Sequence, residues 1–164
     1  MYDPNIVSIS DKYSGGNSHL RRRLDKWAYL ISEIPRHRFD MCIWFHNLNQ
    51  SPTRIHNAED TKHWRGTRAC ALGWAAVYAP FNKLGLKLET DPCSPSFRGL
   101  TCVSACSEFF QIPHQVAAWV VIDTTYHDDR TITPKRVARR IRRVVDYHCE
   151  HGTYVGLTLK QLGD

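Results

Sequence analysis

The sequence lacks the features that most directly assign a function. It has no stretch of about 18 apolar residues, so neither a transmembrane helix nor membrane contact is expected. The first residues, MYDPNIVSIS, do not combine a basic start with an apolar block, so a secretory signal is not expected either. Gly-rich phosphate loops, Gly-rich dinucleotide turns and recognisable Ser-His-Asp or Cys-His spacings are also missing. These absences favour a cytoplasmic chain without a cofactor and without an identifiable catalytic residue.

Cysteine is present, but without the spacing of a disulfide framework. The six cysteines are therefore expected to be reduced thiols, as in a cytoplasmic protein. Two helices that brought Cys102 and Cys106 to His148 and His151 could form a tetrahedral zinc site. The apolar neighbours of the two cysteines favour burial in the core instead. We therefore predict no metal site and keep zinc as an alternative.

Hydrophobic periodicity predicts a mainly α fold. Residues 18–34 carry apolar side chains on one helical face, and Pro35 is expected to end that helix. Thr133 and Pro134 form a favourable helix start, and Gly152 a favourable stop. Further helices are predicted over about 67–78 and 100–112, with loop over 81–99 and a short helix or turn over 39–45. Residues 114–123 fit a strand or a short buried helix, and the helix is favoured.

The chain of 164 residues is long enough for one domain with its own core. Residues 1–17 are predicted to be a flexible N-terminal arm, because SGGN at 14–17 forms a joint before the first helix. Residues 18–164 are predicted to form a single domain of four to five helices with long loops. The C-terminal segment TYVGLTLKQLGD is expected to be a short strand or a docked extended segment.

The segment HWRGTRACALGWAAVYAP, residues 63–80, places unusually small side chains in a predicted helix. Gly73 lowers helix propensity by about 1 kcal/mol, a loss that close packing of another backbone can offset. Free cysteine is among the most buried residue types. We therefore predict that Cys70 and Gly73 belong to the core, and that Cys70 is not a reactive thiol.

Four short motifs occur in order along the chain: FDMCIW at 39–44, GTRACALGWA at 66–75, SEFFQI at 107–112 and TPKRVARRIRRVV at 133–145. They resemble a family of small uncharacterised proteins from bacteria and their phages, over roughly residues 18–147. The family pattern is F-[DN]-M-x-x-W, C-G-T-x-x-C-x-x-G, a Phe-Phe-Gly-Leu-like segment and T-P-x-x-V-A-x-R-I. The resemblance implies a shared helical fold and a phage or bacterial source, but no activity. Arg65 stands where the family has a cysteine, so the Cys-x4-Cys pair is broken here.

The region between the first two predicted helices combines cationic and aromatic side chains. Arginine and histidine suit contacts to phosphate, and tryptophan suits stacking on a base. The net charge of +6 also favours an anionic partner. The predicted anionic-ligand site consists of Arg36, Arg38, Trp44, His46, His63, Trp64, Arg65 and Arg68. The alternative is a polar loop whose tryptophans are anchored in the core.

The segment KRVARRIRR carries six basic residues and no acidic one. A helix would place five of them opposite its apolar face, as a basic stripe able to follow a phosphate backbone or an acidic protein. The predicted basic helix face consists of Lys135, Arg136, Arg139, Arg142 and Arg143. The alternative is a solvated face with Asp146 and Glu150 as local partners. Helix-turn-helix spacing is not recognisable, so sequence-specific reading of DNA is not favoured.

These features favour an accessory protein, of phage or bacterial type, that binds a host protein or an anionic ligand such as a nucleic acid or nucleotide. Inhibition of a host factor or defence system, in the host cytoplasm, is one form of that hypothesis. A small hydrolytic or nucleotide-processing enzyme is the first alternative, using the histidine-rich loop or the acidic segment Asp123–Asp129. A structural subunit of a larger assembly is the second. The oligomeric state stays open.

Overall fold

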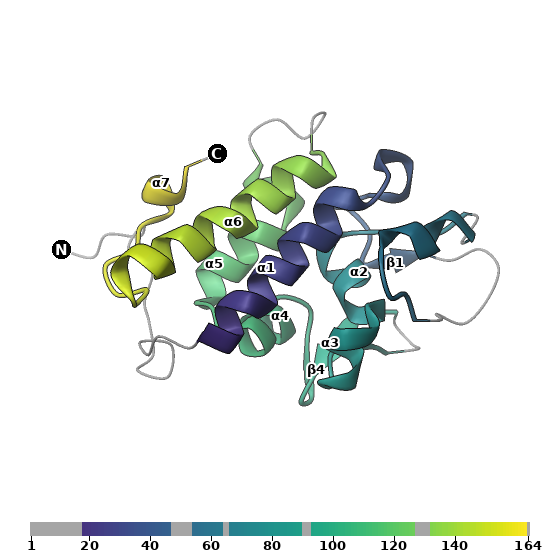
Figure 1. Cartoon of the computed structure of the whole chain (residues 1–164), viewed down its shortest axis with the longest axis horizontal. Coiled ribbons are helices and arrows are strands. Elements are labelled where there is room, and N and C mark those ends of the chain that lie inside the picture. The colour runs from purple at the N-terminus through teal and green to yellow at the C-terminus, as the bar shows by residue number, and fades with distance from the viewer. Residues whose placement is uncertain (1–17, 47–53, 64–65, 90–92, 127–131, 164) are drawn as a thin grey trace.

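The computed structural model describes residues 18–46, 54–63, 66–89, 93–126 and 132–163 (Figure 1). The predicted arm, residues 1–17, lies outside these ranges. Within them the chain is mostly helical, as predicted, with two small antiparallel sheets. The α-helices are α1 (Ser18–Glu33), α2 (Ala71–Val77), α3 (Ala79–Lys83), α4 (Cys102–Phe110), α5 (His114–Val121), α6 (Pro134–His151) and α7 (Leu159–Leu162). The other elements are β1 (Phe45–His46), β2 (Arg68–Ala69), β3 (Lys87–Leu88), β4 (Pro95–Phe97), β5 (Leu100–Thr101) and the 3-10 helices η2 (Arg36–Arg38), η3 (Ala58–His63) and η4 (Asp123–Thr125).

The two longest helices, α1 and α6, lie side by side and run in opposite directions (Figure 1). The predicted apolar stripe of α1, which includes Leu24 and Trp27, is buried. The predicted start of α6 is confirmed, because Thr133 Oγ1 accepts a hydrogen bond from the backbone N–H of Arg136 at 3.1 Å. The predicted stop is confirmed as well, with Gly152 at a left-handed φ of 70°. None of the helices in the described ranges is both long and apolar enough to span a membrane.

Helix α2 is buried along its whole length, and close backbone packing explains its small side chains. A Cβ atom on Gly73 would lie 1.6 Å from the carbonyl oxygen of Trp44, so only glycine fits there. Trp27 Nε1 donates to the carbonyl of Ala71 at 3.0 Å, which ties α1 to the first turn of α2. The core prediction for Cys70 is confirmed, since the residue is 0% exposed. Its Sγ also caps the helix, accepting the N–H of Gly73 at 3.4 Å.

Helix α2 is shorter than the predicted range 67–78, because the residues before Cys70 pair with another strand. β2 pairs with β1, so backbone groups just ahead of the helix are used in a sheet. The segment 39–45, expected as a short helix or turn, is partly extended beside it. The N–H of Asp40 donates to the carbonyl of Ala69 at 3.1 Å, and the N–H of Cys70 donates to Ile43 at 2.8 Å. Tertiary pairing therefore overrides the local helix signal at both places.

Residues 81–99, predicted to be loop, contain most of α3 and of the second sheet. Pro80 lies in the first turn of α3, where a missing N–H removes no helical hydrogen bond. β4 pairs antiparallel with both β3 and β5. Because β5 takes up the residues before it, α4 begins at Cys102 rather than at residue 100. Strands of two or three residues carry too little alternation to be recognised in a sequence.

The C-terminal segment forms helix α7 and not the predicted strand or extended segment. Gln161 donates its backbone N–H to Thr158 Oγ1 at 3.3 Å, and the N–H of Thr158 donates to Gln161 Oε1 at 2.7 Å. This capping box satisfies two N–H groups at the helix start. Leu157 and Leu162 are buried and dock the segment on the core. With α3 and α7, the described residues form seven α-helices where four to five were predicted.

Replacing Gly73 with alanine tests the close approach of the two backbones. We expect Gly73→Ala to destabilise the protein by about 3 kcal/mol, because its Cβ would overlap the carbonyl oxygen of Trp44. Helix propensity alone would stabilise the variant by about 1 kcal/mol. Gly152→Ala is the control, since a Cβ there meets nothing within 4 Å and only the positive φ costs about 1 kcal/mol. Urea unfolding measures both, and a Gly73→Ala variant as stable as the parent contradicts the packing.

Candidate functional site

A surface pocket of about 450 Å³ lies where the segment after α1 meets β2, η4 and the residue before Thr133. Buried Phe39, Met41 and Ile132 form its apolar part. Its polar and ionisable lining residues are Arg36, His37, Asp40, Cys42, Arg68 and Asp123. The pocket thus joins two regions that are far apart in sequence, and each of them carries chemistry that the sequence had singled out.

One wall of the pocket is built by the chain that follows α1. Pro35 ends the helix, and η2 turns the chain so that Arg36 and His37 are exposed. Phe39 then forms a parallel bridge with Ala69, and its buried side chain anchors the segment. Arg36 Nη1 donates to the carbonyl of Phe39 at 3.0 Å, which orients the guanidinium group at the edge of the pocket.

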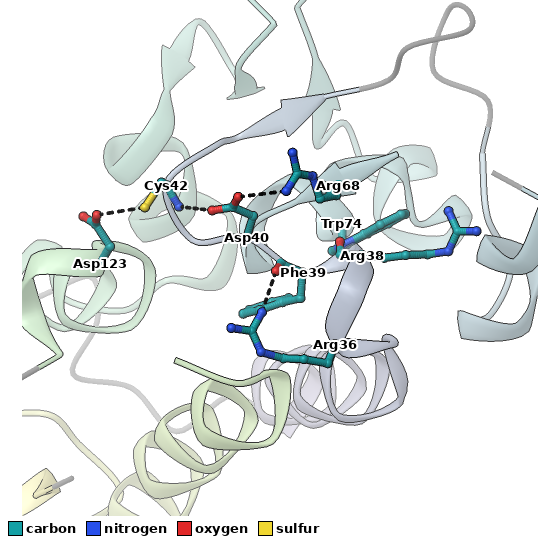
Figure 2. A network of polar contacts seen from close by, with 8 residues as sticks. All are labelled: Arg36, Arg38, Phe39, Asp40, Cys42, Arg68, Trp74 and Asp123. Carbon is teal, nitrogen blue, oxygen red and sulfur yellow. Dashed lines mark hydrogen bonds and ion pairs between the residues drawn. The ribbon is translucent and has the colours of Figure 1, made fainter. Parts of the chain in front are cut away.

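A chain of polar contacts crosses the pocket (Figure 2). Asp40 lies between Arg68 and Cys42: its Oδ2 is 3.8 Å from Arg68 Nη1, and its Oδ1 accepts the backbone N–H of Cys42 at 3.0 Å. Cys42 Sγ donates to Asp123 Oδ2 at 3.4 Å, across to η4. Asp123 Oδ1 accepts the N–H of Thr124 at 2.8 Å. The two carboxylates therefore already receive hydrogen bonds from the protein.

The arginines of the pocket are bound only weakly by these carboxylates. The side chains of Arg68 and Asp40 are 55% and 31% exposed, and their closest charged atoms are 3.8 Å apart. An exposed ion pair of this kind contributes about 1 kcal/mol or less. Arg36 uses one of its five N–H donors on a neutral carbonyl. Both guanidinium groups can therefore turn donors toward an anion in the pocket.

The thiol of Cys42 is held in its protonated form. The hydrogen bond to Asp123 raises the pKa of Cys42, and burial and the charges of Asp123 and Asp40 raise it further. A protonated thiol is a weak hydrogen-bond donor and a poor nucleophile. Burial raises the pKa of Cys70 to about 12, so that thiol is also unreactive. The pocket thus contains a cysteine beside acidic groups, without the cation or base that would activate it among these contacts.

The pocket brings together Arg36 and Arg68 of the predicted anionic-ligand site. The other described members lie elsewhere: Arg38 is buried, Trp44 is half-buried against the core, and His46 is exposed on β1. The side chain of His63, together with Trp64 and Arg65, lies outside the described residues. Of the predicted acidic segment Asp123–Asp129, Asp123 lines the pocket and residues 127–129 lie outside the description.

His37 and Cys42 were not predicted as members of this site. His37 was one of several histidines in a loop, and Cys42 carried no spacing signal because its partner Asp123 is 81 residues away. The motif FDMCIW contains the only available hint, since Asp40 and Cys42 alternate with buried Phe39 and Met41. That alternation is typical of extended chain with one face toward the core.

The predicted basic face of α6 contains residues that are exposed to solvent and residues that contact other parts of the fold. Lys135, Arg139 and Arg142 are exposed. Arg136 lies over the ring of Tyr126 at 5.3 Å, and Arg143 Nη1 donates to the carbonyl of Leu162 at 3.0 Å. The exposed stripe is therefore narrower than predicted, because two of its five members contact other parts of the fold.

The sixth basic residue of the segment, Arg140, points inward and is 2% exposed. Its Nη1 donates to the carbonyl of Trp119 at 2.5 Å and to Thr125 Oγ1 at 2.9 Å, and its Nη2 donates to the carbonyl of Thr125 at 2.9 Å. The guanidinium carbon also lies 3.5 Å from the ring centroid of Tyr126. Arg140 follows Val137 of the apolar face by three residues, and this spacing is a signal in the sequence that its side chain points inward.

The zinc alternative gains no geometric support from the described residues. Cys106 is buried, while His148 packs against Tyr154 with ring centroids 4.8 Å apart. His151 stacks on Tyr147 at 4.1 Å. In the part of the chain that the structure describes, no three histidine, cysteine, aspartate or glutamate side chains are grouped to hold a metal ion. Cys102 is half-buried in the first turn of α4.

Comparison with protein-family models, curated proteins and solved structures finds no match to this chain. The geometry of the pocket and the residues of the chain therefore carry the functional argument.

Removing Arg140 should destabilise the protein far more than removing its neighbour. We expect Arg140→Ala to cost about 3 kcal/mol, because the buried carbonyl of Trp119 and the part-buried carbonyl and hydroxyl of Thr125 lose their donor. Arg139→Ala is the matched control, exposed on the same helix, and should change stability by about 0.5 kcal/mol or less. Urea unfolding measures both variants. Equal effects would show that Arg140 has no special structural role.

The contact between Cys42 and Asp123 predicts a change in thiol reactivity. Asp123→Asn weakens the hydrogen bond that raises the pKa of Cys42 and removes the charge that raises it further, so more thiolate forms at neutral pH. We expect alkylation of Cys42 by iodoacetamide to accelerate by about threefold or more, since the thiolate is the reacting species. Mass spectrometry of the peptides measures each rate, with exposed Cys149 as the internal control. Unchanged Cys42 kinetics, or rapid labelling of Cys70 in the folded protein, would contradict this description.

Proposed function

We propose that the chain is a non-enzymatic binding protein whose pocket beside Arg36 and Arg68 takes an anionic, phosphate-bearing ligand such as a nucleotide. The observation that carries the proposal is the pair of guanidinium groups at one pocket, neither held by a close ion pair to another described residue. Guanidinium groups match phosphate oxygens in charge and in hydrogen-bond geometry. Exposed His37 lies on the same wall and adds a third side chain that can donate a hydrogen bond to an anion.

The size and floor of the pocket support a ligand larger than a bare phosphate. Its volume of about 450 Å³ falls in the range of small-molecule sites. Phe39, Met41 and Ile132 offer apolar surface on which a sugar or base can lie. Asp123 and Asp40 supply acceptors for hydroxyl or amino groups of the same ligand. A nucleotide combines all of these groups in one molecule.

The chemistry of the pocket favours binding over catalysis. The one thiol in it is held protonated by an acidic neighbour, which is the opposite of the activation that a nucleophilic cysteine needs. The carboxylates of Asp40 and Asp123 accept hydrogen bonds from the protein and hold the two walls together. Combined with the resemblance to phage and bacterial proteins, this supports an accessory role in a host cytoplasm, through a ligand or a host protein that presents one.

Calorimetric titration with inorganic pyrophosphate and with adenosine monophosphate tests the site. We expect the double variant Arg36→Gln/Arg68→Gln to bind at least about tenfold more weakly, because two charge-assisted contacts are lost. The control is Arg139→Gln/Arg142→Gln, which removes the same charge from the exposed face of α6. It should bind as the parent does. A parent that binds neither probe refutes the proposal, and an equal loss in the control variant would assign binding to the basic helix instead.

A further inference from the structure

A second pocket, of about 290 Å³, lies between the C-terminal half of α1, the start of η3 and the junction of α2 with α3. The described residues that line it include two tyrosines and two glutamates but, unlike those of the first pocket, no arginine. Those that matter here are Tyr29 and Glu33 of α1, His56 and Glu59 near η3, and Tyr78. The two tyrosines come from separate elements that meet at this pocket.

The wall opposite α1 is fixed by backbone hydrogen bonds. The N–H of Ile55 donates to the carbonyl of Val77 at 2.8 Å, and the N–H of Ala79 donates to the carbonyl of Ile55 at 2.7 Å. Ile55 and Tyr78 thereby form a parallel bridge, and the Ile55 side chain is buried. The pocket is therefore preformed on this side, which lowers the entropy that a ligand must remove on binding.

The start of η3 is held just as firmly. Asp60 Oδ2 accepts the backbone N–H of His56 at 2.7 Å and that of Asn57 at 3.3 Å. Asn57 Oδ1 in turn accepts the N–H of Asp60 at 3.2 Å. These reciprocal bonds set the positions from which His56 and Glu59 line the pocket.

Two tyrosine rings line this space. Tyr29 is 67% exposed, so its ring is open to a ligand. The ring of Tyr78 is half-buried and makes a T-shaped contact with Phe81, with centroids 5.0 Å apart. The face of a tyrosine ring carries partial negative charge and attracts a cation within about 6 Å of its centroid.

The carboxyl groups that line the pocket come from both of its walls. Glu33 is exposed and is the last residue of α1, so its carboxylate lies at the helix end that carries partial negative charge. Glu59, which has a contact of its own in the structure, adds a second carboxylate from the opposite wall. Two carboxylates, a helix C-terminus and two tyrosine rings favour positive charge in one small volume.

We propose that this second pocket binds an organic cation, an ammonium or guanidinium group carried on an alkyl chain. Aromatic faces suit such a group better than a hydrated metal ion, because methyl or methylene groups pack on the rings while the charge is attracted to them. A volume of about 290 Å³ lies at the lower limit of small-molecule sites, so it admits a group of side-chain size and not a nucleotide. The proposal does not depend on the anion pocket.

Nuclear magnetic resonance of the full chain with labelled tyrosine rings tests this site. The probes are choline, for an ammonium group, and acetyl-arginine amide, for a guanidinium group on a peptide unit. The neutral tert-butyl analogue of choline and sodium chloride at equal ionic strength are the ligand controls. We expect saturable shifts of the Tyr29 and Tyr78 ring signals with at least one cation and with neither control. The cation that binds distinguishes a free ammonium compound from an arginine side chain as the natural occupant.

Three variants connect those shifts to the proposed groups. Tyr29→Ala and Glu33→Gln should each weaken binding by about threefold to tenfold, because one ring face or one charge is lost. Tyr29→Phe keeps the ring and should bind as the parent does. All three changes lie on exposed side chains, so the fold should be retained. The proposal is overturned if neither cation produces saturable shifts, if the neutral analogue binds equally well, or if Tyr29→Ala and Glu33→Gln both bind like the parent.

Discussion

The burial of one arginine side chain determines much of this structure. A guanidinium group keeps its charge inside a protein, so every donor that is removed from water needs an acceptor. The carbonyls of Trp119 and Thr125 accept hydrogen bonds from Arg140, and the ring of Tyr126 covers the face of the guanidinium group. These acceptors belong to the end of α5 and to η4, so the charge on α6 dictates where that chain must run. The position of Asp123, at the start of η4, follows from it.

The opposite wall of the first pocket, lined by the chain after α1, has a different physical origin. There the constraint is steric: Gly73 allows the Trp44 carbonyl to touch α2, and the extended chain from Phe39 onward lies against β2 as a result. The hydrogen bond from Cys42 to Asp123 is the point at which the two walls meet. One wall is thus set by electrostatics inside the core and the other by the absence of a single Cβ atom. The pocket exists because both constraints are satisfied in one fold.

The parts of this fold that the sequence predicted are those with local causes. Helix α1 was predicted from the periodic spacing of its apolar residues. The ends of α6 were predicted from Thr133, Pro134 and Gly152, whose effects reach no further than one helical turn. The predicted start of α2 was wrong, because the true start is set by the pairing of β2 with β1, and β1 is more than twenty residues away in the sequence. Arg36 and Arg68 were found by residue type alone, whereas the contact of Cys42 with Asp123 requires the whole chain to be folded. Arg140 was left off the predicted basic face, but its acceptors at Trp119 and Thr125 could not be predicted from the helix pattern, because they belong to other elements.

The end of α1 separates the two pockets. Glu33 lines the pocket that holds two tyrosines and two glutamates, and Arg36 lines the pocket that holds two arginines and two aspartates, with only Ile34 and Pro35 between them. Ile34 is buried, and the ring of Pro35 holds φ at −60°, so this short joint has little freedom. The helix stop at Pro35 therefore fixes how Glu33 and Arg36 are placed at two neighbouring pockets.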